Sequence, residues 1–533
     1  MRPFRIYVAA ASVLAFGVLP VTALGADGPS FVDESATSGI ASTYDGDWEF
    51  TVGGGAAAFD CNADGFEDLL LAGGASPATF YRNASSAGGP LSFVPEQSGL
   101  EIDSVTGTYP IDIDADGNMD VVLLRIGENL VMRGEGACRF TRANELWGFD
   151  GGDAWSTAFA ATWEMGAAWP TLAIGNYIDR YEDISPWGSC TDNWLHRPAD
   201  AGPGFAAPVA LTPSYCALSM LFTDWNRSGT PSLRVSNDRE YYKGGEEQLW
   251  HVMPSEAPRP YSRDEGWQRL RIWGMGIASY DLDADFYPEY FLTSMADHKL
   301  QKLMGSEGGT LMPHYADTAY ASNTTVQQPY AGGEVKPSTG WHAAFEDVDN
   351  DGLADLFVAK GNVDRMPDFA LADPNNLLMQ QPDGTFVEMG DTAGIASLKT
   401  ARGGALADLN LDGLVDLVVV NRREPAEIWR NVTQGAGNWI ELALAQDGPN
   451  RLGIGAWIEI RAGEREIRRE ITLGGGHASG KAGWHHFGLG LADAAEVRVI
   501  WPDGAVSDWQ ALDANGCYIL SPGEAATPWM AAR

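Results

Sequence analysis

Oxygen-bearing side chains recur at one fixed spacing in five short segments of the chain. Each segment has Asp at its first position, Asp or Asn at its third, Asp at its fifth and Asp or Glu at its ninth. Such side chains in a tight loop can converge on one hard cation, and calcium is the natural candidate because it takes about six to eight oxygen ligands. The predicted ligands, including the backbone carbonyl at the seventh position of four loops, are Asp60, Asn62, Asp64, Phe66, Asp68, Asp112, Asp114, Asp116, Asn118, Asp120, Asp281, Asp283, Asp285, Glu289, Asp347, Asp349, Asp351, Leu353, Asp355, Asp408, Asn410, Asp412, Leu414 and Asp416.

A glycine at the sixth position allows the sharp turn that such a loop needs. The loop that begins at Asp281 departs from this pattern, because Phe286 replaces the glycine. The alternative is that Asp, Asn and Gly only form surface turns, as they often do. Five recurrences in register favour about five bound calcium ions. We expect structural ions, because the many ligands leave little room for an open catalytic position.

A repeated unit must position these loops, and their spacing gives its length. The strong loops begin at residues 60, 112, 281, 347 and 408, and a weaker version begins at Asp224 with Ser228 at its fifth position. The long gap before Asp224 has room for one more unit, expected near residues 160–177, where Trp163 and Met165 stand in the place of ligands. A period of about 40–60 residues with several short strands predicts a seven-bladed β-propeller.

The sequence around each loop is typical of propeller strands. Small residues precede a loop, as at 54–60, and an apolar run follows it, as at 69–72. These patterns predict a crowded inner strand and a buried central strand. A fourth strand is expected at 386–395, and a near copy of it occurs at 31–40, whereas the seventh unit lacks one. We therefore expect residues 31–40 to complete the last blade and to close the ring without an unpaired edge.

A second domain is expected after about residue 435, where the acidic loops cease. Apolar and polar residues alternate there, as at 439–444 and 496–501, and this alternation is typical of half-buried antiparallel strands. The prediction is an all-β chain with a signal peptide at 1–25, a propeller at 26–434 and a small β-sandwich at 435–533.

Two groups of residues carry a resemblance to known families. The Asp-loop units resemble FG-GAP/VCBS repeats, which form the propeller of integrin α-subunits, and residues 452–509 resemble the ASPIC/UnbV domain at 453–456, 483–490 and 499–504. The combination is similar to the family of cartilage acidic protein 1 and its bacterial homologues. This resemblance implies calcium binding and adhesion or matrix roles, and it does not imply one particular reaction.

The N-terminus and the composition bear on location. Arg2 and Arg5, an apolar run at 6–19 and small residues at 23–25 have the layout of a bacterial secretory signal, with an uncleaved anchor as the alternative. We expect a periplasmic or secreted protein with no other membrane span. Cys190 and Cys216 are the preferred disulfide pair, and the pairing of the other three cysteines stays open. A formal charge of −37 makes nucleic acid a poor candidate partner.

Other chemistry is sparse. Nucleophile-elbow, zinc-protease and P-loop motifs are absent from the sequence. His477, His485 and His486 are candidates for a transition-metal site, but glycine-rich flanks favour loops, where these histidines and Lys481 would form a polar surface. Tryptophans crowd the third unit, and they either fill blade cores or, where exposed, stack on sugar rings or anchor a protein partner.

Two functions of different classes follow. The first is a non-enzymatic, calcium-binding adhesion or binding module whose partner is a protein or a glycan. The alternative is an enzyme that acts on an extracellular polysaccharide at the central channel of the propeller, because propellers commonly place sites there.

Overall fold

The computed structural model describes residues 28–182, 188–200, 202–238, 244–305, 311–325 and 336–531. The predicted signal peptide at 1–25 lies outside these residues. Strands dominate the described part, in which the helical elements are the 3₁₀ helix η1 (Trp48–Thr51) and the short helices α1 (Asn144–Trp147) and α3 (Gly390–Ala393). The all-β prediction is confirmed.

Two sets of strands make up the described chain. The strands of the first set are β1 (Phe31–Asp33), β2 (Ala56–Phe59), β3 (Asp68–Leu71), β4 (Thr79–Asn83), β5 (Phe93–Pro95), β6 (Val105–Ile111), β7 (Asp120–Arg125), β8 (Leu130–Gly134), β9 (Phe140–Arg142), β10 (Ser156–Thr162), β11 (Thr171–Asn176), β12 (Asn193–His196), β13 (Val209–Leu211), β14 (Ala217–Thr223), β15 (Ser232–Asn237), β16 (Gln248–His251), β17 (Arg259–Pro260), β18 (Gly274–Tyr280), β19 (Glu289–Ser294), β20 (Lys299–Leu303), β21 (Tyr315–Asp317), β22 (Gly340–Glu346), β23 (Asp355–Lys360), β24 (Asn376–Gln380), β25 (Phe386–Glu388), β26 (Ala401–Ala407), β27 (Asp416–Asn421) and β28 (Glu427–Asn431). Those of the second are β29 (Asn438–Leu444), β30 (Trp457–Ala462), β31 (Arg465–Glu470), β32 (Leu473–Gly474), β33 (Gly480–Lys481), β34 (Trp484–Gly490), β35 (Ala494–Ile500), β36 (Gln510–Asp513), β37 (Gly516–Leu520) and β38 (Thr527–Trp529).

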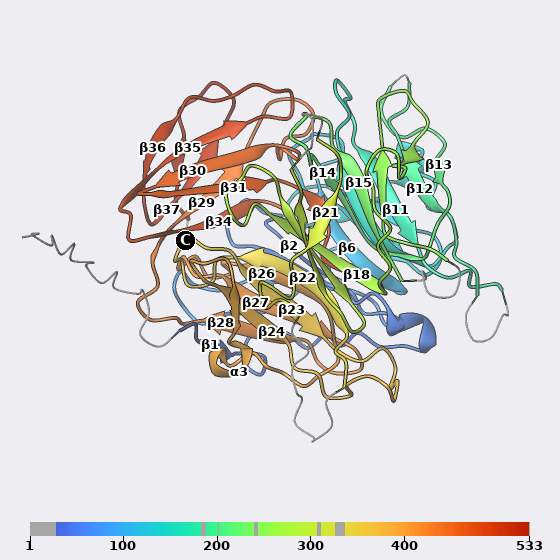
Figure 1. Ribbon diagram of the computed structural model, residues 1–533, viewed down its shortest axis with the longest axis horizontal. Coiled ribbons are helices and arrows are strands. Elements are labelled where there is room, and N and C mark those ends of the chain that lie inside the picture. Colours follow the sequence, from blue (N-terminus) through green and yellow to red (C-terminus); the bar gives the residue numbers. More distant parts are fainter. Residues whose placement is uncertain are drawn as a thin grey trace, which may run out of the picture.

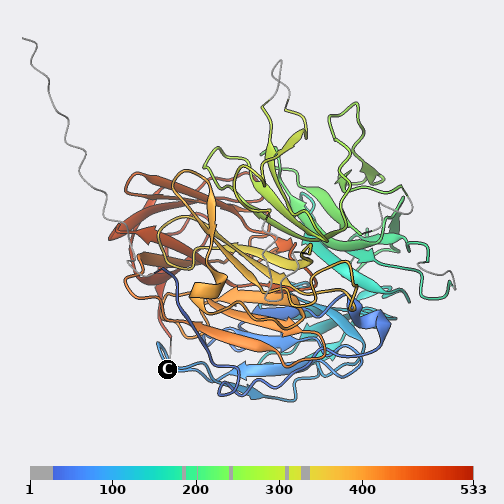
Figure 2. The ribbon, with the colours of Figure 1, turned by 60° about the horizontal axis from the view of Figure 1, so that its bottom comes forward.

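The first set forms seven antiparallel sheets that follow one another along the chain. We number them blade 1 (β2–β5), blade 2 (β6–β9), blade 3 (β10–β13), blade 4 (β14–β17), blade 5 (β18–β21), blade 6 (β22–β25) and blade 7 (β26–β28 with β1). Their first strands contact one another in the order β2, β6, β10, β14, β18, β22, β26 and back to β2, so the sheets surround a common centre (Figures 1 and 2). This arrangement confirms the propeller prediction.

The N-terminal strand closes the ring as predicted. Strand β1 pairs with β28 antiparallel, so that Phe31 lies opposite Asn431 and Asp33 lies opposite Trp429. Blade 7 therefore gains its outer strand from the beginning of the chain. The pairing covers an edge that would otherwise expose unpaired backbone groups.

The second set forms two four-stranded sheets, with the orders β34-β29-β37-β38 and β31-β30-β35-β36. Both sheets bury apolar side chains in one core, such as Ile440 and Phe487 from the first sheet and Ile458 and Val497 from the second. This shared core confirms the predicted sandwich. The same core includes Phe159 of blade 3, and Figure 1 shows the orange and red strands packed against the propeller.

One segment of the C-terminal domain enters the centre of the propeller. Residues 473–482, which we call the channel segment, contain the short strands β32 and β33, which pair with β10 and β2. Three successive glycines make this path possible, because Gly474, Gly475 and Gly476 all have positive φ. A Cβ on Gly476 would lie 2.5 Å from the His342 ring, so no side chain fits there.

The channel segment contacts the inner strand of every blade. Strands β10 and β2 pair with it directly, and hydrogen bonds of 2.6 to 3.3 Å reach the other inner strands. The contacted inner-strand residues are, in blade order, Ala57, Thr108, Ala160, Met220, Ile277, His342 and Gly404. The C-terminal domain thus joins all seven sheets through one short stretch of chain.

His477 lies at the centre of this contact. Its backbone N–H donates to His342 Nδ1 at 3.1 Å, its Nε2 accepts from the N–H of Gly53 at 3.1 Å, and its Nδ1 lies 3.1 Å from the carbonyl oxygen of Leu218. Burial lowers the pKa of His477 to about 3 because the charged imidazole is poorly solvated there. The expectation that His477 joins a polar surface is therefore wrong. His485 and His486 lie on β34 instead of a loop, and His486 is also buried.

Two disulfides link neighbouring blades. Cys190–Cys216 connects blade 3 to the start of blade 4 and confirms the preferred pair. Cys61–Cys138 connects the first Asp loop to blade 2, a pairing that spacing alone did not reveal. Cys517 on β37 is the remaining thiol.

The channel segment gives a direct stability prediction. The Ser479 hydroxyl accepts hydrogen bonds from the N–H groups of Ala56 at 3.0 Å and Gly404 at 3.3 Å. Ser479→Ala leaves both buried donors without this acceptor, so we expect the free energy of unfolding in urea to fall by about 1–3 kcal/mol. Ser86→Ala, at an exposed site, is the control. Equal unfolding curves for the two variants would contradict the proposed contribution of Ser479.

Candidate metal centres and interdomain cleft

Each Asp loop connects the first two strands of its blade and is held by its own carboxylates. In blade 6, Asp347 accepts from the N–H of Gly352 at 2.7 Å, and Asp355 accepts from the N–H groups of Val348 at 3.1 Å and Gln380 at 2.9 Å. The first and ninth side chains thus fix the turn and tie it to the third strand. The same two contacts recur in the other strong loops, at Gly65, Gly117, Phe286 and Gly413 for the first carboxylate and at Cys61, Ile113, Leu282 and Leu409 for the ninth.

Three of these loops bring carboxylate oxygens within 4.8 Å of one another. The sets are Asp112, Asp114 and Asp120 in blade 2, Asp281, Asp283 and Asp285 in blade 5, and Asp347, Asp349 and Asp351 in blade 6. The loops of blades 1 and 7 have Asn at the third position, so they bring fewer carboxylates together. The predicted groupings at the first, third and fifth positions are therefore present in blades 5 and 6, and in blade 2 the ninth side chain joins the first and third.

The donor chemistry of these loops fits calcium. Asp112 Oδ1 in blade 2 and Asn410 Oδ1 in blade 7 are buried acceptors without a hydrogen-bond partner, and an oxygen in that position gains from a hard cation. Burial and the neighbouring Asp349 and Asp351 raise the pKa of Asp347 well above its ordinary value. Such mutual repulsion between carboxylates is what a bound divalent cation relieves.

Basic side chains already lie in two of the loops. In blade 5, Lys302 Nζ contacts Asp283 and lies 3.3 Å from Asp285 and 3.7 Å from Glu289. In blade 2, the Arg133 guanidinium lies 2.8 Å from Asp114 and 2.6 Å from Asp116.

A divalent cation in these loops would compete with the basic side chains for the same oxygens, most directly in blade 5. In the described part of the chain, no Lys or Arg side chain lies within ion-pair distance of the Asp347 loop, and the charge of Arg465 on β31 only opposes the rise in the pKa of Asp349 and Asp351. The sequence pattern could not reveal Lys302, because it lies on β20, outside the loop.

The Asp loops face the C-terminal domain. A Cβ on Gly65 would lie 1.8 Å from the Trp529 ring, and a Cβ on Gly413 would lie 1.9 Å from Trp439 Nε1. In blade 6, His486 Nε2 lies 2.6 Å from Asn350 Oδ1. The sixth-position glycine therefore serves the turn and also leaves room for the second domain.

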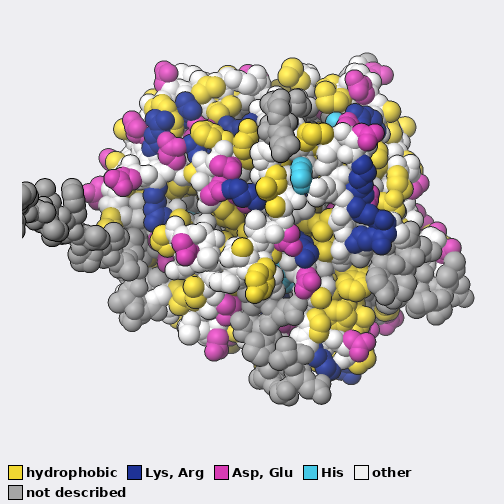
Figure 3. Space-filling model, viewed as in Figure 1, with side chains coloured by type: hydrophobic (Ala, Val, Ile, Leu, Met, Phe, Trp, Pro, Cys, Tyr) yellow, Lys and Arg dark blue, Asp and Glu magenta, His cyan; other side chains and the backbone are white. Residues whose placement is uncertain are grey.

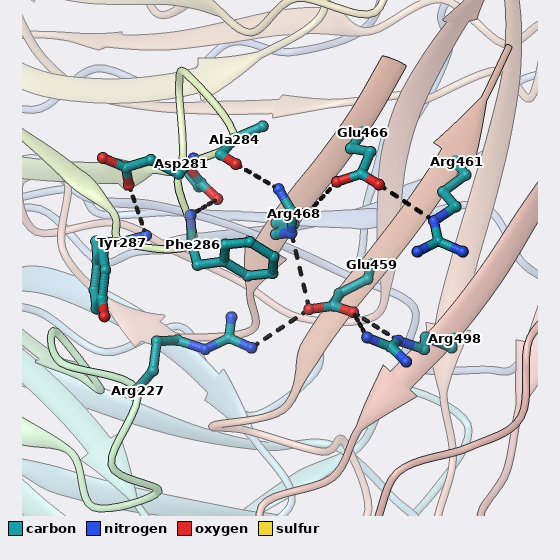
Figure 4. Close-up of polar contacts among 11 residues, drawn as sticks. Arg227, Asp281, Ala284, Phe286, Tyr287, Glu459, Arg461, Glu466, Arg468 and Arg498 are labelled. Atoms are coloured by element: carbon teal, nitrogen blue, oxygen red, sulfur yellow. Dashed lines mark hydrogen bonds and ion pairs between the residues drawn. The ribbon is translucent and has the colours of Figure 1, made fainter. Parts of the chain in front are cut away.

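An arginine network fastens blades 4 and 5 to that domain (Figure 4). Glu459 on β30 is contacted by Arg227 of blade 4 at 3.5 Å and by Arg498 of β35 at 2.6 Å. Arg468 on β31 donates to the carbonyl oxygen of Ala284 at 2.7 Å, and its guanidinium carbon lies 3.6 Å from the centre of the Phe286 ring. Phe286, which replaces the loop glycine, thus packs against the second domain.

Beside this network lies a cleft of about 840 Å³ between the propeller and the C-terminal domain. The propeller wall comes from the loops of three successive blades, and Trp163, Arg227 and Phe286 are examples. Trp457 and Trp501 of the C-terminal domain contribute to the opposite wall. Sequence reasoning noticed each irregular loop but missed the cleft, because its second wall comes from a part of the chain far away in sequence.

The tryptophans of blade 3 divide between core and cleft. Trp147, Trp155 and Trp169 are buried and fill apolar cores, whereas Trp163 is half-buried and lines the cleft. Trp187 lies outside the described residues. The core interpretation is confirmed for Trp147, Trp155 and Trp169, and a ligand-binding role for Trp163 stays a prediction.

Comparison with known proteins gives the class of this protein. The family model of the FG-GAP-like repeat matches residues 60–123, and the model of ASPIC and UnbV matches residues 446–527. The chain is an FG-GAP repeat protein with a C-terminal UnbV domain. No curated protein matches the chain.

Solved structures with a similar arrangement share little sequence with this chain. BBS1N in complex with ARL6DN has 10% identity and a TM-score of 0.43, covering 76% of this chain and 97% of that one. An Agrocybe aegerita lectin that recognises non-reducing terminal N-acetylglucosamine has 14% identity and a TM-score of 0.40, covering 72% and 92%. A Trichoderma reesei protein of carbohydrate-active enzyme family AA12 has 10% identity and a TM-score of 0.36, covering 77% and 98%.

The contrast between blades 5 and 6 gives a metal-binding prediction. Asp285 and Asp351 occupy the same fifth position, but Lys302 already forms ion pairs with carboxylates in the loop of Asp285. We expect Asp351→Asn to lose one bound calcium ion per chain and Asp285→Asn to lose none, measured as calcium content after dialysis. Loss of one ion from both variants would show that the ammonium does not exclude the metal.

Proposed function

We propose that this protein is an exported, calcium-stabilised propeller that binds a protein or glycan partner without converting it. The observation that supports this function best is the channel segment. It contacts the inner strand of every blade, so it fills the part of the channel in which the alternative, an enzyme, would hold its substrate. The conspicuous carboxylates are committed to holding loops and ions.

The proposed export of the protein is supported by its two disulfides and by its N-terminal sequence. Two disulfides favour an oxidising compartment, which for an exported bacterial protein is the periplasm or the exterior. Within the described residues, no helix has the length and apolar character needed to cross a membrane.

The surface charge agrees with a partner that is not a polyanion. Acidic and basic side chains are interspersed over the face in Figure 3, apart from one group of Lys and Arg side chains near its right edge. With a formal charge of −37, the chain repels nucleic acids at long range.

Calcium would have a structural task in this function. The Asp loops lie between the blades and the C-terminal domain, so ions bound there would neutralise carboxylates at the contact between the two domains. Asp347, Asp349, Asp351 and Asp355 are the side chains that would hold an ion in blade 6, together with the carbonyl of Leu353. The expected number of about five ions stays a prediction.

The alternative enzyme retains one possible location. Opposite the Asp loops, the channel opens into a pocket of about 280 Å³ with aromatic walls that include Trp48, Trp273 and Trp341. The hydroxyl of Tyr177 contacts the carboxylate of Asp238 at this pocket. These groups favour a second candidate, a polysaccharide-active site at this mouth of the channel.

Chelation tests the structural role of calcium. Ions that bind only the folded state stabilise it by about 2.7 kcal/mol per site when their concentration is a hundred times the dissociation constant. We expect excess chelator to lower the melting temperature, and added calcium to restore it. A melting temperature that does not change in excess chelator would contradict a structural role for calcium.

Binding and turnover separate the two candidate functions. We expect saturable binding to a member of a glycan and protein panel, with no release of product over long incubation. Turnover that is lost in Asp238→Asn, while calcium content and melting temperature stay unchanged, would favour the enzyme instead.

A further inference from the structure

Three successive blades depart from the metal-loop pattern, and their loops meet at one place. Blade 3 has Trp163 and Met165 at the first and third positions, blade 4 has Ser228 at the fifth, and blade 5 has Phe286 at the sixth. All four residues line the cleft against the C-terminal domain. We propose that this cleft is a carbohydrate-binding site for a short uncharged oligosaccharide, which rests on the binding function proposed above and specifies its partner.

The walls of the cleft offer aromatic faces to a ligand. Phe286 is 45% exposed, and Tyr287 and Trp163 are half-buried. Large apolar side chains that stay exposed in a concave site mark places where a ligand gains from burial. A volume of about 840 Å³ lies in the range of small-molecule sites. The C–H face of a sugar ring is flat and apolar enough to lie against such rings.

Three hydrogen-bond donors of residues that line the cleft lack a partner. Trp163 Nε1, Trp457 Nε1 and Arg227 Nη1 are buried atoms without a hydrogen-bond partner. All three atoms belong to residues that line the cleft. A buried donor without a partner is unfavourable, so a ligand whose hydroxyl oxygens reach any of these donors gains an interaction that an apolar ligand lacks. A purely apolar ligand would leave them unsatisfied.

Carboxylates on the same walls argue for a neutral ligand. Asp224, Glu164 and Asp285 line the cleft, whereas Arg227 is the basic side chain among the lining residues. Burial raises the pKa of Glu470, which also lines the cleft, to about 8, so this carboxyl group adds little negative charge at neutral pH. Sugar hydroxyls can donate to such carboxylates and also accept from the indole N–H groups. Sulfated sugars and uronates would meet like charges here and in the whole protein.

The ring of Phe286 is held in place for this role (Figure 4). Its backbone has φ of 81°, a conformation that is costly for a residue with a side chain. The Arg468 guanidinium lies over one face of the ring, with its central carbon 3.6 Å from the ring centre. Arg227 is fixed in the same way, because it lies 3.9 Å from the centre of the Trp457 ring and contacts Glu459. Both side chains are thus ordered before a ligand arrives.

The test uses the full secreted chain with calcium and two cleft variants. Phe286→Gly restores the glycine of the other loops and removes the ring, and Trp163→Leu removes an indole face and a donor. Tyr320→Ala is the control, because Tyr320 is 88% exposed and is not among the lining residues. Short neutral oligosaccharides of hexose and N-acetylhexosamine, and the matching uronate oligomers, are titrated while intrinsic tryptophan fluorescence is recorded.

We expect at least one neutral oligosaccharide to bind saturably, and each cleft variant to bind it about ten-fold more weakly while Tyr320→Ala does not change. A single cooperative unfolding transition on heating would show that each variant is folded. Three results would overturn the proposal: no binding of any neutral oligosaccharide, preference for uronates, or equal affinity in all variants. If a protein ligand binds while no sugar does, the result would support the proposed binding function and contradict the proposed carbohydrate site. Turnover of a bound sugar would overturn the binding function itself.

Discussion

The structure depends on one stretch of backbone that contacts all seven blades at the propeller axis. The channel segment runs so close to the inner strands that no Cβ fits at several glycines of either partner. A Cβ on Gly55 would lie 1.9 Å from the carbonyl oxygen of Ala478, and a Cβ on Gly403 would lie 2.6 Å from Ser479 Oγ. The small residues of the inner strands are therefore needed for this contact as well as for the crowding around the axis, and the propeller and the sandwich form one structural unit.

The position of the channel segment limits where a ligand could bind. The channel segment occupies the channel from the side of the Asp loops. The interdomain cleft lies where the loops of blades 3 to 5 have Trp163, Ser228 and Phe286 in place of residues of the regular Asp loop. The blades with more regular loops pack closely on the second domain, as Gly65 does on Trp529 and Gly413 does on Trp439. The regular loops are thus covered by the second domain, whereas the irregular loops border the cleft.

Local and repeated features could be predicted from the sequence. Four features follow from patterns within one unit or between copies of it: the Asp loops, a third unit that lacks the Asp pattern, the strand at 31–33 that closes the ring, and the Cys190–Cys216 disulfide. Contacts between distant segments could not be predicted. His477 was expected on a surface because glycines flank it, but those glycines let it enter the channel. The spacing of residues in the sequence also gives no sign of three other contacts, because they form between distant segments. These are the ion pairs of Lys302, the Cys61–Cys138 disulfide and the far wall of the cleft.

The most direct test is a crystal structure of the full chain, grown with calcium and soaked in neutral oligosaccharides. The account predicts the channel segment in place against every inner strand, ions in the Asp loops led by that of blade 6, and sugar density between Phe286 and the C-terminal domain. Sugar held in the opposite pocket beside Asp238, or a channel segment displaced to admit it, would contradict the account and favour an enzyme.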